Sequence, residues 1–175
     1  MTLLGLRPAT RADIPAVVGL VTRAYRGAPG SGGWTTEADL LDGSRIDADL
    51  LAADLATERS EVLLAEHDGV VRACVHVAEY DDAGHLGMFA VEPALQGSGL
   101  GKDVMAAAER YLVDQWGASS IRLSVISVRS ELIAFYERRG YRRTGETQPF
   151  PYGDIRFGEP KRDDLEFVVL AKHVG

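Results

Sequence analysis

The sequence Gln96-Gly97-Ser98-Gly99-Leu100-Gly101-Lys102, which we call the glycine turn, joins a predicted strand to a predicted helix. Glycine lets the backbone approach a ligand closely, and the first amides of a helix have no partner within the helix. These amides and the positive end of the helix dipole form an anion site that suits a pyrophosphate. We therefore predict that the glycine turn binds a phosphate-bearing ligand, since a tight turn alone does not require so many glycines.

Two common nucleotide-binding motifs do not fit this stretch. A P-loop needs glycine at position 96 and serine or threonine at position 103, where this chain has Gln96 and Asp103. A dinucleotide-binding fingerprint needs glycine or alanine at position 102, where Lys102 stands. The strand ahead of the turn is also predicted to belong to an antiparallel meander. The phosphate ligand is therefore expected to be of another kind.

The predicted elements around the glycine turn form a mixed α/β pattern. Apolar alternation and turn signals such as Asp68-Gly69 predict strands at residues 3–7, 61–67, 70–80, 85–91, 120–126, 141–147 and 165–171. Helical spacing predicts helices from Asp13 (or Thr10) to Tyr25, over 36–57 with an interruption near Asp42-Gly43, over 99–116 and over 130–139. Residues 148–164 are predicted to be a long loop. A meander followed by two strand–helix units predicts a mixed sheet.

Several stretches resemble the GNAT N-acetyltransferase superfamily. Gln96, Gly99 and Gly101 match its acyl-CoA motif, Gln or Arg-x-x-Gly-x-Gly or Ala. Three further stretches resemble other segments of the family. They are Met88-Phe89-Ala90-Val91-Glu92-Pro93-Ala94-Leu95-Gln96, Phe135-Tyr136-Glu137-Arg138-Arg139-Gly140-Tyr141, and Arg7-Pro8-Ala9-Thr10 followed by Asp13. The resemblance implies one GNAT domain over residues 1–175, of the α/β (α+β) class. Its central sheet would be mixed and mostly antiparallel, with about seven strands flanked by about four helices.

The same resemblance implies that acetyl-CoA is the co-substrate. The backbone of Phe89, Ala90 and Val91 would hydrogen-bond the pantetheine arm, in a gap between this strand and the strand at 121–126. The pyrophosphate would lie against Gln96, Gly97, Ser98, Gly99, Leu100, Gly101 and Lys102. Arg129 stands where many members carry an asparagine that meets the cofactor. We interpret Arg129 either as a contact to a cofactor phosphate or as a solvated charge at a helix start.

Acetyl transfer to an amine needs a proton donor for the leaving thiolate, and Tyr136 occupies the position of the family's acid. A phenol, with an ordinary pKa of about 10, is protonated at neutral pH and can give its proton to sulfur. The alternative is a core aromatic residue, because Ile133 and Tyr136 share a helix face. We predict that Tyr136 is the acid.

The general base is less defined by the sequence. Some members of the superfamily carry a glutamate where this chain has His85, and an imidazole can accept a proton near neutral pH, directly or through water. On an alternating strand, His85, Gly87 and Phe89 would face the same way. His85 could equally be an exposed histidine beside its turn. Glu79, at the end of the neighbouring strand, is the alternative base.

The acceptor is expected to be a primary amine of a small molecule or peptide. Trp34, Phe150 and Tyr152 would give its pocket apolar walls, and Glu37, Glu79 or Asp154 could hold an ammonium. Each of these residues also fits an ordinary loop aromatic or a solvated carboxylate. The alternative function is a catalytically idle acyl-CoA-binding or sensor domain.

Composition narrows the possible partners. The 175 residues carry a formal net charge of −7, which repels nucleic acid and favours a cationic acceptor. No run suggests a membrane span or a signal peptide, so we expect no membrane partner and a cytoplasmic location.

The histidines lack metal-ligand spacing, and no metal is implied. The single cysteine, Cys74, is predicted to be buried. A monomer or a homodimer is expected.

Overall fold

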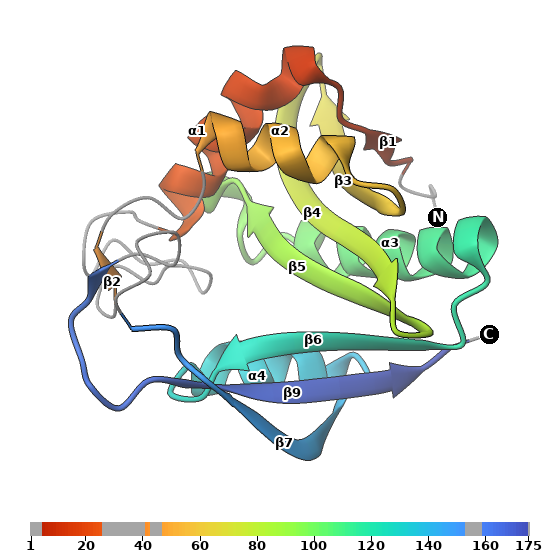
Figure 1. Ribbon diagram of the computed structural model, residues 1–175. Helices are drawn as coiled ribbons and strands as arrows, with labels where there is room; N and C mark the ends of the chain where they lie inside the picture. The colour runs from red at the N-terminus through yellow and green to blue at the C-terminus, as the bar shows by residue number, and fades with distance from the viewer. Residues whose placement is uncertain (1–4, 26–40, 43–46, 153–158, 175) are drawn as a thin grey trace.

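A computed structural model describes residues 5–25, 41–42, 47–152 and 159–174. Its centre is a seven-stranded sheet with the order β1-β3-β4-β5-β6-β9-β7 (Figure 1). These strands are β1 (Arg7–Pro8), β3 (Ser60–His67), β4 (Val70–Tyr80), β5 (Ala83–Val91), β6 (Ser120–Ile126), β7 (Arg142–Pro149) and β9 (Glu166–His173). Neighbouring strands are antiparallel except β5 and β6, which are parallel.

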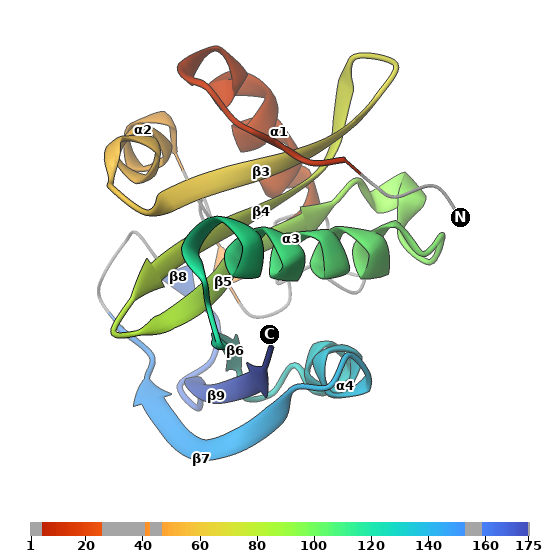
Figure 2. The same ribbon diagram turned by 90° about the vertical axis from the view of Figure 1, so that its right-hand side faces the viewer.

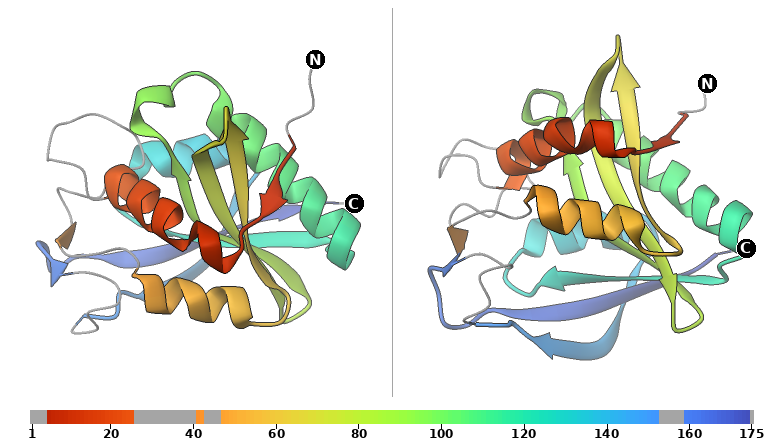
Figure 3. Two further views of the ribbon diagram at one scale, coloured as in Figure 1. Left: turned by 90° about the horizontal axis from the view of Figure 1, so that it is seen from above. Right: turned by 45° about the horizontal axis from the view of Figure 1, so that its top comes forward.

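Helices cover both faces of this sheet. They are α1 (Ile14–Tyr25), α2 (Ala48–Ala56), α3 (Leu100–Trp116) and α4 (Ser130–Arg138), with short 3₁₀ turns at Arg11–Asp13 and Pro93–Leu95. Figures 2 and 3 show α1 and α2 on one face and α3 and α4 on the other. Each face therefore has its own apolar core, and Cys74 is buried in the core under α1 and α2, as predicted. The mixed sheet between two helical layers confirms the predicted fold class.

The parallel pair β5–β6 opens soon after it begins. Only Gly84 with Ile121 and His85 with Arg122 are in register, after which the two strands separate. Figure 1 shows β5 and β6 converging near the β4–β5 turn and diverging toward the other end of the sheet. The sheet therefore contains a wedge-shaped opening between these two strands.

A β-bulge lies in β5 beside this opening. Cys74 pairs with Ala90 and His76 with Gly87, so a single β4 residue lies opposite both Met88 and Phe89. The extra residue is accommodated at Met88, whose φ is +42°, an unusual value for a side chain of this size.

The bulge overturns one prediction about side-chain direction. Leu86 and Phe89 both pack in the core under α3 and α4, whereas Met88 packs under α1 and α2. Phe89 therefore points away from the face that His85 presents. Simple alternation along the strand predicted that Phe89 and His85 share a face. This prediction is wrong because the bulge adds one residue to the strand between them.

Two predicted elements differ in detail. Within the predicted helix over 36–57, the described residues form only one helix, α2. Leu41–Asp42 instead forms a short strand, β2, that pairs with β8 (Glu159–Pro160). The predicted loop at 148–164 starts later, since Gln148 and Pro149 extend β7 along β9. Backbone pairing with distant strands decides both cases, and local side chains carry little signal for it. None of the described helices has the length and apolar character that a membrane span requires.

Candidate active site

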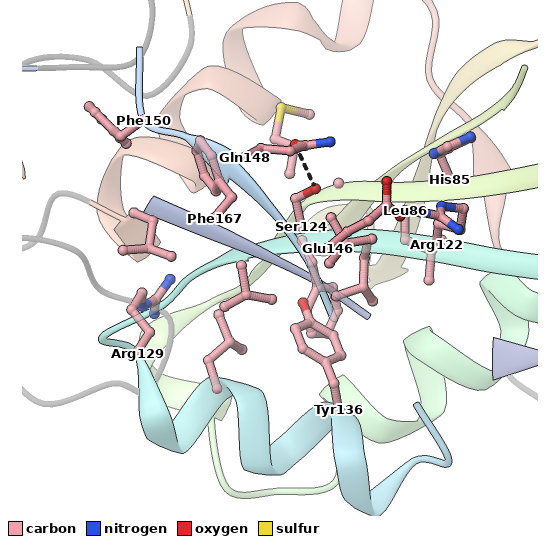
Figure 4. A pocket seen from close by; sticks show the side chains of 18 of the residues that line it. His85, Leu86, Arg122, Ser124, Arg129, Tyr136, Glu146, Gln148, Phe150 and Phe167 are labelled. Carbon is pink, nitrogen blue, oxygen red and sulfur yellow. Dashed lines mark hydrogen bonds and ion pairs between the residues drawn. The ribbon is translucent and has the colours of Figure 1, made fainter. Parts of the chain in front are cut away.

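A cavity of about 670 Å³, which we call the wedge cavity, lies where β5 and β6 diverge (Figure 4). Its described lining residues are Tyr25, Tyr80, Asp81, His85, Leu86, Gly87, Met88, Phe89, Arg122, Leu123, Ser124, Val125, Ile126, Arg129, Leu132, Tyr136, Glu146, Gln148, Phe150, Phe167 and Val169. Leu86, Phe89 and Tyr136 belong to the core under α3 and α4, whereas Tyr25 and Met88 belong to the core under α1 and α2. The wedge cavity thus reaches both faces of the sheet.

Tyr136 projects from α4 into the wedge cavity. Its side chain is almost fully buried, and Figure 4 shows its hydroxyl directed into the cavity. Edge-on contacts hold the ring against Phe135 and Tyr141, with centroid distances of 5.5 Å and 5.9 Å. Burial raises the pKa of the Tyr136 phenol far above its usual range, Tyr25 adds to the rise and Arg129 opposes it. The group is therefore a protonated phenol at neutral pH, which is the state a proton donor needs.

His85 lies at another part of the same lining. Its ring stacks on Tyr80 with a centroid distance of 3.5 Å, and its Nε2 lies 3.2 Å from the Tyr80 carbonyl oxygen. Because a carbonyl only accepts, Nε2 carries the proton of the neutral ring and Nδ1 keeps a lone pair. Burial lowers the pKa of His85, the Tyr80 hydrogen bond opposes this, and Arg122 lowers it further. The imidazole is therefore neutral at neutral pH.

Polar side chains from β6 and β7 form a stripe across the wedge cavity. Arg122 of β6 forms an ion pair with Glu146 of β7, and Ser124 Oγ donates to Gln148 Oε1 at 3.3 Å (Figure 4). Since β9 lies between β6 and β7, both contacts cross over it. We call these four residues the polar stripe. None of the four was predicted as a site residue, because the strand order that brings them together is a tertiary feature.

The predicted acceptor residues fall in different places. Phe150 is buried and lines the wedge cavity, with its ring stacked on Phe167 at 5.6 Å. Tyr152 packs edge-on against Phe150 and is not among the described cavity lining, and its hydroxyl accepts a hydrogen bond from the Leu165 amide at 2.8 Å. Glu79 forms an ion pair with Arg59 at 2.8 Å and is not among the described residues that line the cavity. Trp34, Glu37 and Asp154 lie outside the described residues.

The glycine turn forms a second cavity of about 480 Å³, which we call the phosphate cavity. Gly97 and Gly99 have φ values of +85° and +90°, which glycine adopts without strain. The first backbone hydrogen bond of α3 runs from the Asp103 amide to the Gly99 carbonyl at 3.1 Å. The amides of Gly101 and Lys102 therefore precede the first hydrogen bond within the helix, at the positive end of the helix dipole.

Three cations surround these amides. Lys102, Arg138 and Arg139 line the phosphate cavity together with a single described carboxylate, Glu131. This local excess of positive charge contrasts with the acidic chain as a whole and suits a polyphosphate. Arg138 and Arg139 were not predicted. Glu131, Ala134, Phe135 and Arg138 recur at helical spacing and so share one face of the predicted helix over 130–139. This shared face could have been used to predict the two arginines.

Three predicted cofactor residues make other contacts. Gln96 Nε2 donates to the Val91 carbonyl at 3.1 Å, and Ser98 Oγ donates to the Leu95 carbonyl at 2.5 Å. Both side chains thus brace the glycine turn from within. Arg129 lines the wedge cavity with Tyr136 and is not among the described lining of the phosphate cavity.

The two cavities adjoin along β5 and α4. Phe89 lines the wedge cavity and Phe135 the phosphate cavity, and their rings stack with centroids 6.2 Å apart. Val91, two residues after Phe89, lines the phosphate cavity, while Ala90 is buried in the core under α1 and α2. A ligand bound at the glycine turn therefore has the wedge cavity as its neighbouring space.

Comparisons with known proteins agree with this arrangement. Mycothiol acetyltransferase from Salinispora tropica is 35% identical over 148 residues, and that from Salinispora arenicola is 33% identical over 151 residues. Each match covers 82% of this chain and 45% of the relative, so the chain spans about half the length of these curated relatives. The crystal structure of the ribosomal-protein-S18-alanine N-acetyltransferase from Escherichia coli has the same fold. It is 19% identical with a TM-score of 0.70, covering 98% of this chain and 94% of that chain.

The family model for the acetyltransferase (GNAT) family matches residues 29–141. This range includes β3–β6, the glycine turn and α4, and it holds all of the described lining of the phosphate cavity and most of that of the wedge cavity. The chain therefore belongs to the acetyltransferase (GNAT) family.

Proposed function

We propose that this chain transfers the acetyl group of acetyl-CoA to the primary amine of a small molecule or peptide. The observation that carries the proposal is the juxtaposition of the two cavities. A basic phosphate cavity at the start of α3 adjoins a cavity that reaches both faces of the sheet and contains a buried, protonated tyrosine. Such a site can hold a long phosphate-bearing donor on one side and admit an acceptor from the other.

The residues present fit acetyl-CoA. The amides of Gly101 and Lys102, with the side chains of Lys102, Arg138 and Arg139, would hold its phosphates. The backbone of β5 between Phe89 and Val91 joins the two cavities and would guide the pantetheine arm between them. The thioester would then lie in the wedge cavity, within the space that Tyr136 faces.

Acetyl transfer to an amine requires two proton transfers by the protein. Bound acetyl-CoA supplies a thioester whose carbonyl carbon forms a C–N bond with the neutral amine as the C–S bond breaks. Tyr136 gives its proton to the departing sulfur, so that CoA leaves as a thiol. His85, through Nδ1 or a water, takes the proton that the amine nitrogen loses. One proton is given and one is taken, so the protein returns to its starting state by proton exchange with water.

The polar stripe and Phe150 are proposed to contact the acceptor. Glu146 and Asp81 can attract a cationic amine, whereas Phe150 and Phe167 give the opposite wall an apolar surface. The curated relatives are named mycothiol acetyltransferases, which favours a small-molecule acceptor. The deacetylated form of mycothiol is therefore the first acceptor that we would test.

A two-stage experiment tests the proposal. Calorimetry with acetyl-CoA and CoA tests donor binding, and release of free thiol is then followed with a panel of amines. The panel contains deacetylated mycothiol, polyamines, amino acids and a peptide with an N-terminal alanine. Amine-dependent thiol release, with the acetylated amine detected by mass spectrometry, would support the proposal. Tight acetyl-CoA binding without transfer to any amine would instead support the idle acyl-CoA-binding domain.

A further inference from the structure

Tyr25 makes a contact that the proposed mechanism does not use. It is the last residue of α1, and its side chain is buried with 8% of its surface exposed. Its hydroxyl donates a hydrogen bond of 2.8 Å to the Phe89 carbonyl, which belongs to the bulged part of β5. Tyr25 also lines the wedge cavity together with Phe89 and Tyr136. One phenol thus joins α1 to the strand that forms the cavity wall.

Among the described residues, β6 gives the bulge no backbone pairing. The register of β5 with β6 ends at His85, ahead of Met88 and Phe89. The bulge also carries an uncommon backbone conformation, with Met88 at φ +42°. A buried carbonyl needs a donor, and the Tyr25 hydroxyl supplies one from another element. We therefore expect the position of the bulge to depend on Tyr25.

We propose that Tyr25 is a positioning residue for acetyl transfer, because its hydroxyl holds the Phe89 carbonyl and so fixes the wall of the wedge cavity that Tyr136 faces. This inference rests on the proposed function. Phe89 is a sensitive point, because its ring stacks on Phe135 where the wedge and phosphate cavities adjoin. A shift of Phe89 would move the donor relative to Tyr136, and misplacement of reacting groups by about 1 Å can cost on the order of 100-fold in rate.

The test compares two tyrosines that each lose one hydroxyl. Tyr25→Phe removes the donor to Phe89 and keeps the ring. Tyr111→Phe is the matched control, because Tyr111 of α3 also donates to another element, the Glu61 carboxylate, but lies outside the described lining of both cavities. We expect Tyr25→Phe to lower kcat by roughly 10- to 100-fold with little change in the KM for acetyl-CoA. Tyr111→Phe should keep kcat close to that of the unaltered chain.

Hydrogen exchange of the ligand-free protein gives a second readout. Tyr25→Phe should speed amide exchange within β5 near Met88 and Phe89, and Tyr111→Phe should not. Acetyl-CoA-binding titration corrects kcat for any loss of folded protein. Equal kcat values in the two variants, or unchanged exchange in β5, would overturn the inference. So would the loss of an ionisation from the pH profile in Tyr25→Phe, because that would make Tyr25 a proton-transfer group. If the unaltered chain transfers acetyl to no amine, the proposed function itself fails, and the inference with it.

Discussion

At the scale of single residues, Tyr136 and His85 line the same cavity, and burial shifts their pKa values in opposite directions. Burial acts on both groups by disfavouring the charged form. It therefore raises the pKa of the Tyr136 phenol and lowers the pKa of the His85 imidazole. Both groups are neutral at pH 7 as a result, one able to give a proton and the other able to accept one. This pairing supports the acid and base roles that we propose for the two residues.

The role of Tyr136 can be tested by removing only its hydroxyl. Tyr136→Phe should leave acetyl-CoA affinity nearly unchanged, because the ring contacts with Phe135 and Tyr141 remain. Turnover should fall by roughly 10²–10⁴, the usual contribution of a positioned proton donor. We expect equal falls in kcat and kcat/KM from steady-state thiol release. Near-normal turnover of this variant would show that water or another group protonates the sulfur.

The pH dependence tests His85. A base must be neutral to act, and protonation on lowering the pH removes that form. Because burial lowers the pKa of His85, the acidic limb of kcat/KM should have its midpoint below the ordinary value of about 6.5. His85→Gln should abolish this limb and lower the plateau, whereas His173→Gln, an exposed histidine of β9 outside the described cavity lining, should change neither. A limb that persists in His85→Gln would assign the base to another group.

At the scale of elements, the glycine turn and the first turn of α3 are proposed to act together as one anion site. Gly97 and Gly99 take positive φ values, and an added Cβ at either position meets no atom within 4 Å. The space beside these glycines is therefore open rather than filled by protein. An open, basic surface at a helix start is what a pyrophosphate requires.

Glutamate substitutions separate this binding role from a purely conformational one. Gly97→Glu and Gly99→Glu should abolish acetyl-CoA binding in calorimetry, because each places a negative charge where phosphate would lie. Gly69→Glu is the control: Gly69 also has a positive φ and open space, but it lies in the β3–β4 hairpin. All three variants carry similar backbone strain. Retained affinity in the glycine-turn variants, or an equal loss in the hairpin variant, would contradict the assignment.

At the scale of the whole molecule, the wedge divides the sheet into two parts that share little backbone pairing. Other contacts must therefore hold β6, β9 and β7 against the rest. One is an ion pair in which Lys172 Nζ of β9 contacts the Glu109 carboxylate of α3 at 2.7 Å and 3.1 Å. Among the described residues, Glu109 is the one charged residue that is buried. The pair thus joins the covering helix to the far part of the sheet.

Breaking this pair should destabilise the fold. Lys172→Met leaves the Glu109 carboxylate without its cation in a partly buried place, and we expect the free energy of unfolding to fall by about 1–3 kcal/mol. The Lys172→Met/Glu109→Gln double variant should recover part of the loss, because it removes the uncompensated charge. Urea denaturation measures both effects. Arg162→Met, which breaks an exposed ion pair with Asp164, serves as the control and should leave stability unchanged. Equal stability of Lys172→Met and the unaltered chain would show that the pair contributes nothing.

Most of the elements and the class of the fold could be predicted from the amino-acid sequence. Local features carry these signals: apolar periodicity for the helices and strands, Asp68-Gly69 for the hairpin, and the glycine turn for the start of α3. The same local features identified the candidate phosphate site, since helix amides and neighbouring glycines are contiguous in the chain. Tyr136 was also predicted, because it lies within a contiguous signature at the end of α4.

The construction of the wedge cavity, in contrast, follows from long-range contacts. Arg122 meets Glu146 across β9, and Tyr25 reaches Phe89 from α1, because of strand order and helix packing rather than sequence spacing. The bulge at Met88 turned Phe89 to the opposite face from the one that alternation predicted. Such contacts join residues that are distant in sequence, so no local pattern records them. The half of the site that is proposed to bind phosphate could therefore be predicted from the sequence, whereas the half that would meet the acceptor depends on the folded molecule.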